Sequence, residues 1–528
     1  MIMPHAPCLT VTPEPVVRLE NYFQEPYNLA VATARTCYSS RVISPGDVGR
    51  DEQAREQRDR IAESTYKAGH HTTIQHPTFQ FVLEKVSRQF IWSFLHAHPF
   101  YNSEQVSQRF VEVKPEHFTI PPLEDAARAI YLKAVRAQMD AYHGLCELVE
   151  PTVRAEYRRL FGARDLEDKR WRSAIKKRCQ EVARYVLPVA THAHLYHTIS
   201  GITLHRYRRL CQQFDAPLEQ RFVVQRMVDE VCKVDPKFMA LAEDPIPLEK
   251  TLEYQALQSL HAGSANGTGS RFVDAFDREL DPYTSKLVDY KVHAQETMAQ
   301  AVRSVLGVPP GQLSDQQAID LVLNPARNPY LSDTLTLTTV SKLSRAMAHP
   351  HFTFKKKLSH TADSQDQRHR MVPASRPILQ THFVADRPDY VVPALIHATP
   401  EALAAYGEVM ATVWRAITQL LELGVSHEFA LYLLPNAFPI RFEESGDLLH
   451  FHHKWVQRLC YTAQEEIWNS CREEVLQVTE RFPEIGRHLQ APCWPRSQAG
   501  IRPYCPEGDR FCGVAVWKLP VAEYQRLI

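Results

Sequence analysis

The feature that most constrains the fold is an internal repetition. Features of the first half recur in the same order in the second half, and the offset falls from 268 residues (Arg18 and Lys286) to 245 residues (Gly201 and Gly446). Ordered self-similarity at this scale indicates a duplicated structural unit. The matching pairs are Arg18–Tyr22 with Arg35 against Lys286–Tyr290 with Arg303, His76–Phe81 against His349–Phe354, Arg184–Pro188 against Leu431–Pro435, and Gly201 against Gly446.

Hydrophobic periodicity gives both halves the same order of elements. The segment 79–86 alternates in part and predicts a strand, and a second strand is expected near 350–358. Apolar residues at three-to-four spacing predict helices. The expected helices are 125–150, 172–186, 203–213 and 218–234, then 400–424 and 446–480. The fold class is therefore α+β, with two tandem repeats that each combine a small antiparallel sheet with packed helices.

The domain boundaries follow from a change in amino-acid composition near the middle of the chain. Residues 262–270 hold three of the 18 glycines and no large apolar side chain, which is typical of a linker or exposed loop. A chain of 528 residues also exceeds what one core usually fills. We therefore expect an N-terminal repeat over 1–260, a linker over 261–284, a C-terminal repeat over 285–485 and a cysteine-containing tail over 486–528.

Composition excludes several classes of function. With 61 basic and 61 acidic residues the formal net charge is zero, which argues against binding nucleic acid by bulk electrostatics. The glycine-rich phosphate loops of dinucleotide-binding and P-loop proteins are absent from the sequence. Neither a signal peptide nor an apolar run of 18 residues occurs, so we expect no membrane partner. Together with 11 scattered cysteines, this predicts a cytoplasmic protein.

The most informative motifs lie in the first half, and in their order they resemble the flavin-dependent thymidylate synthases, the ThyX family. The resemblance extends over about residues 16–235 and, more weakly, over about 285–485. The segments that carry it are Arg35–Ser39, Gly69–His70, Gln75–His76, Val86–Arg88, Ser107–Phe110, Ile120–Pro122 and Ala183–Pro188.

The family's signature is an Arg-His-Arg triplet followed after seven residues by Ser, and the two halves depart from it differently. Near His98 the first half has lost both arginines, and the triplet reads 96–98 or 97–99 depending on the direction of counting. The second half keeps the triplet as Arg368–Arg370, nine residues after Ser359 and with Gln365 three residues before it, but lacks the Ser-Gln-Arg end.

A second difference between the halves is reciprocal. The family places an Arg twelve residues after a Gly, against the pyrimidine; this position is Gln213 in the first half and Arg458 in the second. Conversely, the Arg before Val-Leu-Pro is Arg184 in the first half and Leu431 in the second. Complementary retention suggests one working site per chain, assembled from both repeats. Since family members are tetramers with sites between subunits, two fused halves suggest a homodimer.

The resemblance implies a function and a set of roles. The reaction would be reductive methylation of dUMP to dTMP, with FAD as cofactor and with NADPH and methylene-tetrahydrofolate as co-substrates. Arginine and serine side chains suit a nucleotide phosphate because they donate several hydrogen bonds to its oxygens. The residues implied are Ser107, Arg109, Arg184, Gln365 and Arg368 for the substrate, His70, Arg368, His369 and Arg370 for the flavin, and Arg458 as the catalytic arginine beside the uracil ring.

Two other interpretations stay open at this point. The altered first-half triplet and Gln213 are compatible with a flavoenzyme that acts on another pyrimidine nucleotide. A non-catalytic nucleotide-binding scaffold is the alternative of a different class. Against it, a site that decays without selection does not readily leave complementary sets of site residues in the two halves.

The tail is a separate candidate site. Cys493, Cys505 and Cys512 lie within 20 residues of one another in a segment rich in Pro and Gly, which has little core of its own. Zinc held by thiolates would stabilise such a segment, with His488 or Cys471 as a possible fourth ligand. The spacing is not a paired Cys-x-x-Cys, so buried free thiols are the alternative.

Overall fold

The computed structural model describes residues 10–96, 100–261 and 268–528, which form two compact units. Each unit is built mainly from one repeat but includes a segment of the other. The first unit comprises residues 1–137, 188–266 and 415–434, and the second comprises 138–187, 267–414 and 435–528. The compact units are therefore not contiguous in sequence, whereas the repeats are.

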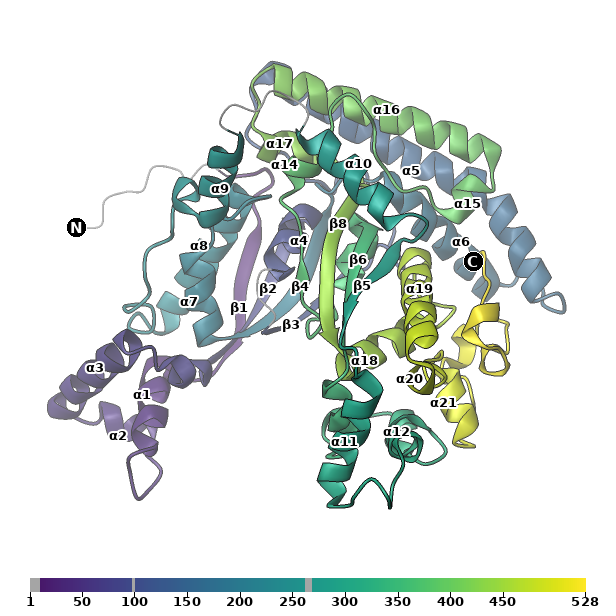
Figure 1. Ribbon diagram of the computed structural model, residues 1–528. Helices are drawn as coiled ribbons and strands as arrows, with labels where there is room; N and C mark the ends of the chain where they lie inside the picture. The colour runs from purple at the N-terminus through teal and green to yellow at the C-terminus, as the bar shows by residue number, and fades with distance from the viewer. Residues whose placement is uncertain (1–9, 97–99, 262–267) are drawn as a thin grey trace. The chain divides into compact units, whose positions relative to one another are not determined.

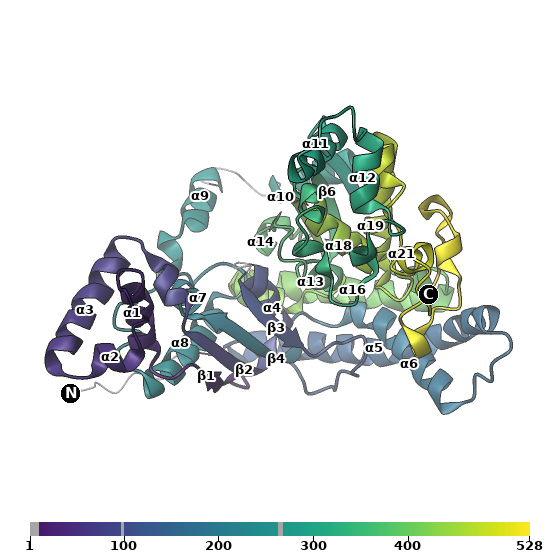
Figure 2. The ribbon, with the colours of Figure 1, turned by 90° about the horizontal axis from the view of Figure 1, so that it is seen from below.

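The first unit is organised around an antiparallel sheet of four strands in the order β1-β2-β4-β3. Its strands are β1 (Val16–Tyr22), β2 (Thr78–Ser87), β3 (Tyr101–Gln105) and β4 (His192–Ser200). The helices α4 (Arg88–His96), α7 (Gly201–Arg209) and α8 (Pro217–Val234) pack against this sheet (Figure 1). Figure 2 shows α1 (Pro26–Thr36), α2 (Pro45–Gly49) and α3 (Glu52–Lys67) gathered together, followed in the chain by the short helix η1 (His71–Gln75).

The second unit repeats this plan with a sheet in the order β5-β6-β8-β7. Its strands are β5 (Ser285–Tyr290), β6 (His351–Ser359), β7 (Ala374–Ser375) and β8 (Pro439–Asp447). The helices α13 (His360–Asp366), α18 (Leu448–Arg458) and α19 (Glu465–Arg481) pack on the sheet. The sequence expectation of two tandem α+β repeats, each with a small antiparallel sheet, is confirmed.

Apart from the exchanged helical segments described below, the remaining elements are short or lie around these sheets. In the first unit they are η3 (Leu248–Lys250) and α9 (Leu252–His261). In the second unit they are α10 (Thr268–Leu280), α11 (Ala294–Leu306), α12 (Asp315–Leu323), η4 (Pro329–Ser332), η5 (Leu337–Thr339), η6 (Ser344–Ala348), α14 (Leu379–His382), α15 (Ala394–His397), α20 (Pro483–Gly486), α21 (Cys493–Gln498), η8 (Gly508–Arg510), η9 (Val516–Lys518) and η10 (Val521–Glu523).

Strand register shows how closely the repeats correspond. Both first strands carry an irregularity at the same place, between Leu19 and Asn21 in β1 and between Leu287 and Asp289 in β5. The strand register also corrects the alignment of the two halves around Gly201 and Gly446. Phe352 pairs with Gly446, whereas its counterpart Phe79 pairs with Ile199 rather than with Gly201. The offset through β4 and β8 is therefore 247 residues, and the counterpart of Arg458 is Cys211 and not Gln213.

Two helical segments belong to the unit of the opposite repeat. The long helix α5 (Asp125–Leu160) begins in the first unit and from residue 138 belongs to the second, as do α6 (Lys169–Ala183) and η2 (Arg184–Val186). The helix α16 (Pro400–Glu422) begins in the second unit and ends in the first, followed there by α17 (His427–Ala430) and η7 (Leu431–Leu433).

Equivalent backbone hydrogen bonds hold the exchanged segments in both units. In the first unit Val189 N donates to Leu434 O at 2.8 Å and Ala190 N donates to Tyr432 O at 3.0 Å. In the second unit the corresponding donors, 247 residues later, are Asn436 and Ala437, which bond Leu187 O at 2.8 Å and Tyr185 O at 2.9 Å.

In the first unit a buried glutamate anchors the exchanged segment. Glu219 of α8 accepts hydrogen bonds from Ser87 N at 2.8 Å, Ser87 Oγ at 2.6 Å and Tyr432 Oη at 2.6 Å. Its side chain is fully buried, and burial raises its pKa. Ser87 and Glu219 belong to the first repeat and Tyr432 to the second, so the carboxyl group ties the exchanged segment to its host.

The same arrangement occurs in the second unit. Glu466 of α19 accepts from Ser359 N at 2.8 Å and from the hydroxyl groups of Ser359 and Tyr185. Here Tyr185 is the residue from the other repeat. Glu466 is half-buried, and the three donors satisfy its carboxyl group where water has limited access.

The predicted elements agree with most of the observed ones. The strand expected at 79–86 is β2, the helices expected at 125–150, 203–213 and 218–234 are α5, α7 and α8, and those expected after residue 400 are α16, α18 and α19. The interval 261–284 differs from the expected linker because α10 occupies residues 268–280. Val273, Phe276 and Leu280 form a buried helical stripe there. Residues 262–267 lie outside the described part of the chain.

No helix in the described residues is long and apolar enough to cross a bilayer.

Removing either cross-repeat tyrosine hydroxyl group should destabilise the protein. We expect Tyr432→Phe and Tyr185→Phe each to lower the free energy of unfolding by about 1–3 kcal/mol, because the carboxyl group of Glu219 or of Glu466 loses a donor. Urea unfolding followed by tryptophan fluorescence measures this. Tyr196→Phe is the control, since Tyr196 is 52% exposed and its replacement should cost less than about 0.5 kcal/mol. Equal stability of all three variants would contradict the anchoring role.

Candidate active site

The retained Arg-His-Arg triplet lies in the second unit, directly after α13. Ser359 ends β6 and caps this helix, since its Oγ accepts a hydrogen bond from Ala362 N at 3.1 Å. The helix ends at Asp366, and residues 368–370 follow in a turn. The two turns of α13 therefore separate the triplet from the end of β6 and set its position relative to the sheet.

Arg458, at the end of α18, contacts the triplet. Its Nε donates to His369 Nε2 at 2.9 Å, and one of its terminal nitrogens donates to Gln365 O at 3.3 Å. The structure thus brings together three residues that the sequence implicated separately. Because Nε2 accepts a hydrogen bond, the proton of the neutral imidazole resides on Nδ1, which is then the donor of the ring.

Electrostatics keep His369 neutral. Burial and the neighbouring charges of Arg458 and Lys454 hold the pKa of His369 well below its ordinary value. The ring is therefore uncharged near neutral pH and acts as a hydrogen-bonding group rather than a cation. Arg368 is exposed and Arg370 half-buried, so the positive charge of the triplet comes from its two arginines.

Five fully buried charged side chains form a network one helical turn from these residues. Lys356 of β6 contacts Asp366 at 3.3 Å, Glu444 at 3.0 Å and Glu474 at 2.8 Å. Lys454 of α18 contacts Asp366 at 2.7 Å and also Glu444. The network joins β6, β8, α13, α18 and α19, and so fixes the elements that carry His369 and Arg458.

The network contains three carboxyl groups but only two ammonium groups, and this imbalance affects the pKa values of the carboxyl groups. Burial opposes ionisation of Asp366, but Lys356 and Lys454 outweigh it and hold its pKa well below the usual range. Burial and the charge of Asp366 raise the pKa of Glu444 to about 7. Glu444 is therefore the group that titrates near neutral pH.

The equivalent positions of the first unit hold aromatic side chains. Counted from the equivalent residues Ser87 and Ser359, Asp366 corresponds to Phe94. With the offset of 247 residues, Glu444 and Lys454 correspond to His197 and Tyr207. The rings of Phe94 and Tyr207 lie 4.4 Å apart, and His197 Nε2 lies 3.1 Å from Tyr207 Oη. One repeat thus has an aromatic core where the other has ions. Sequence reasoning missed this network because Lys355–Lys357 and Glu443–Glu444 look like solvated surface charges; their alternation along β6 and β8 is the signal that could have revealed it.

Arg184 belongs to the second unit although its sequence belongs to the first repeat. It follows α6, and its side chain is 4% exposed. Its Nε donates to Glu181 O at 3.1 Å and its carbonyl oxygen accepts from Asn436 Nδ2 at 2.9 Å. The second unit therefore collects candidate residues from both repeats: Arg184, Gln365, Arg368, His369, Arg370 and Arg458.

The other candidates lie in the first unit. Ser107 begins a turn in which its Oγ accepts from Arg109 N at 3.2 Å, and the Arg109 guanidinium lies 5.3 Å from the centre of the Phe110 ring. His70 is exposed just before η1. The altered triplet around His98 lies outside the described residues, since 97–99 are not described. The participation of Ser107, Arg109 and His70 in a common site stays a prediction.

Unpaired buried groups beside the triplet bear on whether a cofactor fits. Among the described residues, Gln365 Nε2 and both polar side-chain atoms of Gln367 are buried without a hydrogen-bond partner. Such groups are costly unless something binds them. A ring system rich in carbonyl and N–H groups, such as an isoalloxazine or a pyrimidine, has the complementary chemistry, so the residues present fit the flavin that the resemblance implies.

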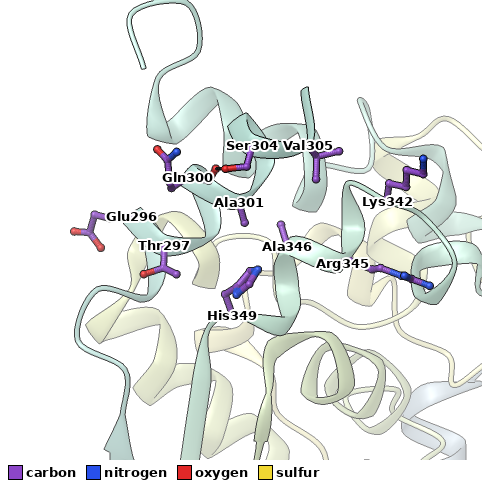
Figure 3. A pocket seen from close by; sticks show the side chains of 10 residues that line it. All are labelled: Glu296, Thr297, Gln300, Ala301, Ser304, Val305, Lys342, Arg345, Ala346 and His349. Atoms are coloured by element: carbon purple, nitrogen blue, oxygen red, sulfur yellow. Dashed lines mark hydrogen bonds between the residues drawn. The ribbon is translucent and has the colours of Figure 1, made fainter. Parts of the chain in front are cut away.

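An open pocket of about 660 Å³ lies elsewhere in the second unit, between α11 and η6. Figure 3 shows Glu296 at one end and Lys342 and Arg345 at the other, with Thr297 and His349 between them. None of the site residues predicted from the sequence lines this pocket, so it is distinct from the Arg458–His369 contact.

Cys493, Cys505 and Cys512 line one cavity, and neither of the expected fourth ligands, His488 and Cys471, lines it. His488 instead contacts Asp320 at 3.0 Å, and Cys471 is fully buried in the core. Among the described residues no group of three or more His, Cys, Asp or Glu side chains is arranged as a ready metal site.

Comparison with known proteins identifies the family. The family model described as "Thymidylate synthase complementing protein" matches residues 18–237 and again residues 286–484. These regions include more than half of the chain, which therefore belongs to this family and carries its unit twice. As a member of the family the protein is an enzyme, as the resemblance predicted.

Curated relatives are similar over one copy of the unit. A flavin-dependent thymidylate synthase of Clostridium tetani is 28% identical over 229 residues, which are 42% of this chain and 83% of the relative. A flavin-dependent thymidylate synthase of Nitratidesulfovibrio vulgaris is 27% identical over 241 residues, 43% of this chain and 87% of the relative. The UMP/dUMP methylase PolB of Streptomyces cacaoi, solved with 5-Br dUMP, aligns at 19% identity and a TM-score of 0.29, over 43% of this chain and 95% of that one.

Neutralising Glu444 should remove a pH dependence of stability. Because its folded pKa of about 7 lies above its ordinary value of 4.5, its contribution is fully present at low pH and is lost as the pH rises through about 7. We expect Glu444→Gln to gain stability relative to the wild type between about pH 5 and pH 8. Thermal unfolding across this range measures the difference.

The matched control is Glu443→Gln, which changes the exposed neighbour on the same strand. Its stability should follow the wild type at every pH. Parallel curves for the wild type and Glu444→Gln would show that Glu444 does not titrate in this range.

Proposed function

We propose that the protein catalyses reductive methylation of dUMP to dTMP, with FAD as cofactor and with methylene-tetrahydrofolate and NADPH as co-substrates. Membership of the family and relatives named flavin-dependent thymidylate synthases support this function. The observation that carries the proposal is the contact of Arg458 with His369 and Gln365, in the repeat that keeps the triplet.

The proposed roles follow from the chemistry of each group. Arg368 and Arg370 supply guanidinium forks for phosphate oxygens. Neutral His369, through its Nδ1–H, and Gln365, through its unpaired Nε2, would donate hydrogen bonds to ring carbonyl groups. Arg458 would stabilise negative charge that develops on the pyrimidine ring, because a fixed cation in a partly dry site costs no reorganisation during the reaction.

The residues named above would hold the flavin and the nucleotide without forming covalent bonds to either. When bound, the flavin supplies the redox and carbon-transfer chemistry, so the protein's part is binding, orientation and electrostatics. The buried network around Lys356 and Lys454 would keep α13 and α18 in register, so that His369 and Arg458 stay aligned.

Titration of the flavin-loaded protein with dUMP tests the proposal. We expect dUMP to shift the flavin absorbance spectrum, and Arg458→Ala to weaken dUMP binding about 10–100-fold, since a charge-assisted contact is worth about 1.5–3 kcal/mol. Arg458→Lys should recover part of this loss, because it restores the charge but not the planar fork.

Arg172→Ala is the matched control, because Arg172 is an exposed arginine of the same unit. It should bind dUMP as the wild type does. A protein that binds FAD but responds to UMP and not to dUMP would redirect the proposal to another pyrimidine nucleotide. Failure to bind any flavin would overturn it.

A further inference from the structure

Four cysteines border one small enclosed cavity in the second unit. The three cysteines of the tail, Cys493, Cys505 and Cys512, are joined there by Cys460, which lies two residues after the end of α18. The cavity encloses about 20 Å³, and its other lining groups are mainly apolar or aromatic, including Phe511 and Trp517. Cys460 is 33 residues before Cys493 in sequence, so only folding brings it to the cluster.

None of the four thiols is engaged in a disulfide. Two of them make only weak polar contacts, Cys460 Sγ with Thr462 Oγ1 at 3.2 Å and Cys512 Sγ with Val514 O at 3.5 Å. Clustered thiols in an enclosed apolar setting are the donor set that soft metals select.

The surrounding segment has little regular secondary structure, although Val516, Val521 and Tyr524 are buried in the core. After α21 the chain contains only three short 3₁₀ helices over residues 508–523. Gly508 and Gly513, on either side of Cys512, both adopt positive φ, at 55° and 85°. A segment with so little regular structure is stabilised most by a cross-link that ties it to the core, and Cys460 provides the core end of such a link.

We propose that Cys460, Cys493, Cys505 and Cys512 bind a metal centre through four thiolates, which fastens the C-terminal tail to the end of α18. The centre is structural, and four thiolates leave no position open for a substrate. Four-thiolate sites hold either a single zinc ion or an iron–sulfur cluster. Because the described residues contain no ready-made group of ligands, the four thiols that line the cavity must lose their protons and move together when the metal binds.

Metal analysis of the full-length protein, purified without chelators and under nitrogen, tests the proposal. We expect either about one zinc ion per chain, or iron with a matching amount of acid-labile sulfide. Native mass spectrometry of the wild type should show the corresponding excess mass, which disappears on acid denaturation. This measurement needs no variant, so it does not depend on whether a variant folds.

Variants locate the site. Cys460→Ala should lose the metal, as should Cys512→Ala, while Cys179→Ala should retain it. Cys179 is the matched control because it is a buried thiol of the same unit away from the cavity. Flavin binding is measured in parallel, so that loss of the metal and failure of the proposed enzymatic function are distinguishable.

Two results would overturn the proposal. One is a wild-type protein that contains neither zinc nor iron in stoichiometric amount after growth in supplemented medium. The other is a metal content that is the same in Cys460→Ala and Cys179→Ala.

Discussion

The architecture depends on two glutamates, one fully buried and one half-buried, that accept hydrogen bonds from both repeats. Glu219 and Glu466 each receive a serine amide and hydroxyl from their own repeat and a tyrosine hydroxyl from the other. A buried carboxyl group without these donors would cost several kcal/mol, so each unit is complete only when the exchanged segment is present. This requirement explains why the compact units cross the repeat boundaries while the sheets do not.

The two repeats have diverged most in what their cores contain. Where the first unit packs Phe94, His197 and Tyr207, the second buries ions that include Asp366 and Lys454. A charged core of this kind is weak evidence for stability, because desolvation offsets much of the attraction. Its position, one turn from His369 and Arg458, points instead to a role in holding the site, and this agrees with retention of the family's triplet in the same repeat.

Sequence patterns predicted much of this structure. The duplication could be predicted because motifs recur in the same order in both halves. The α+β class and the principal helices could be predicted because hydrophobic periodicity indicates which face of an element is buried. The strands β4 and β8 escaped prediction. The first alternates in burial but carries three histidines, and the second buries Arg441 and Glu444, so neither shows the apolar alternation on which strand prediction relies. Arg458 and His369 were identified by motif, but not as direct partners.

The amino-acid sequence by itself determined that the chain is a duplicated member of its family and which repeat keeps Arg368, His369, Arg370 and Arg458. Only the tertiary structure decided that Arg184 belongs to the unit of the other repeat, that Lys356 and Glu444 are buried, and that Cys460 joins the tail cysteines. The physical reason is that motifs and periodicity are local along the chain. An exchanged helix, a buried ion network and a thiol cluster, by contrast, are made of pairs distant in sequence, whose contact is selected by packing and by the need to satisfy buried polar groups.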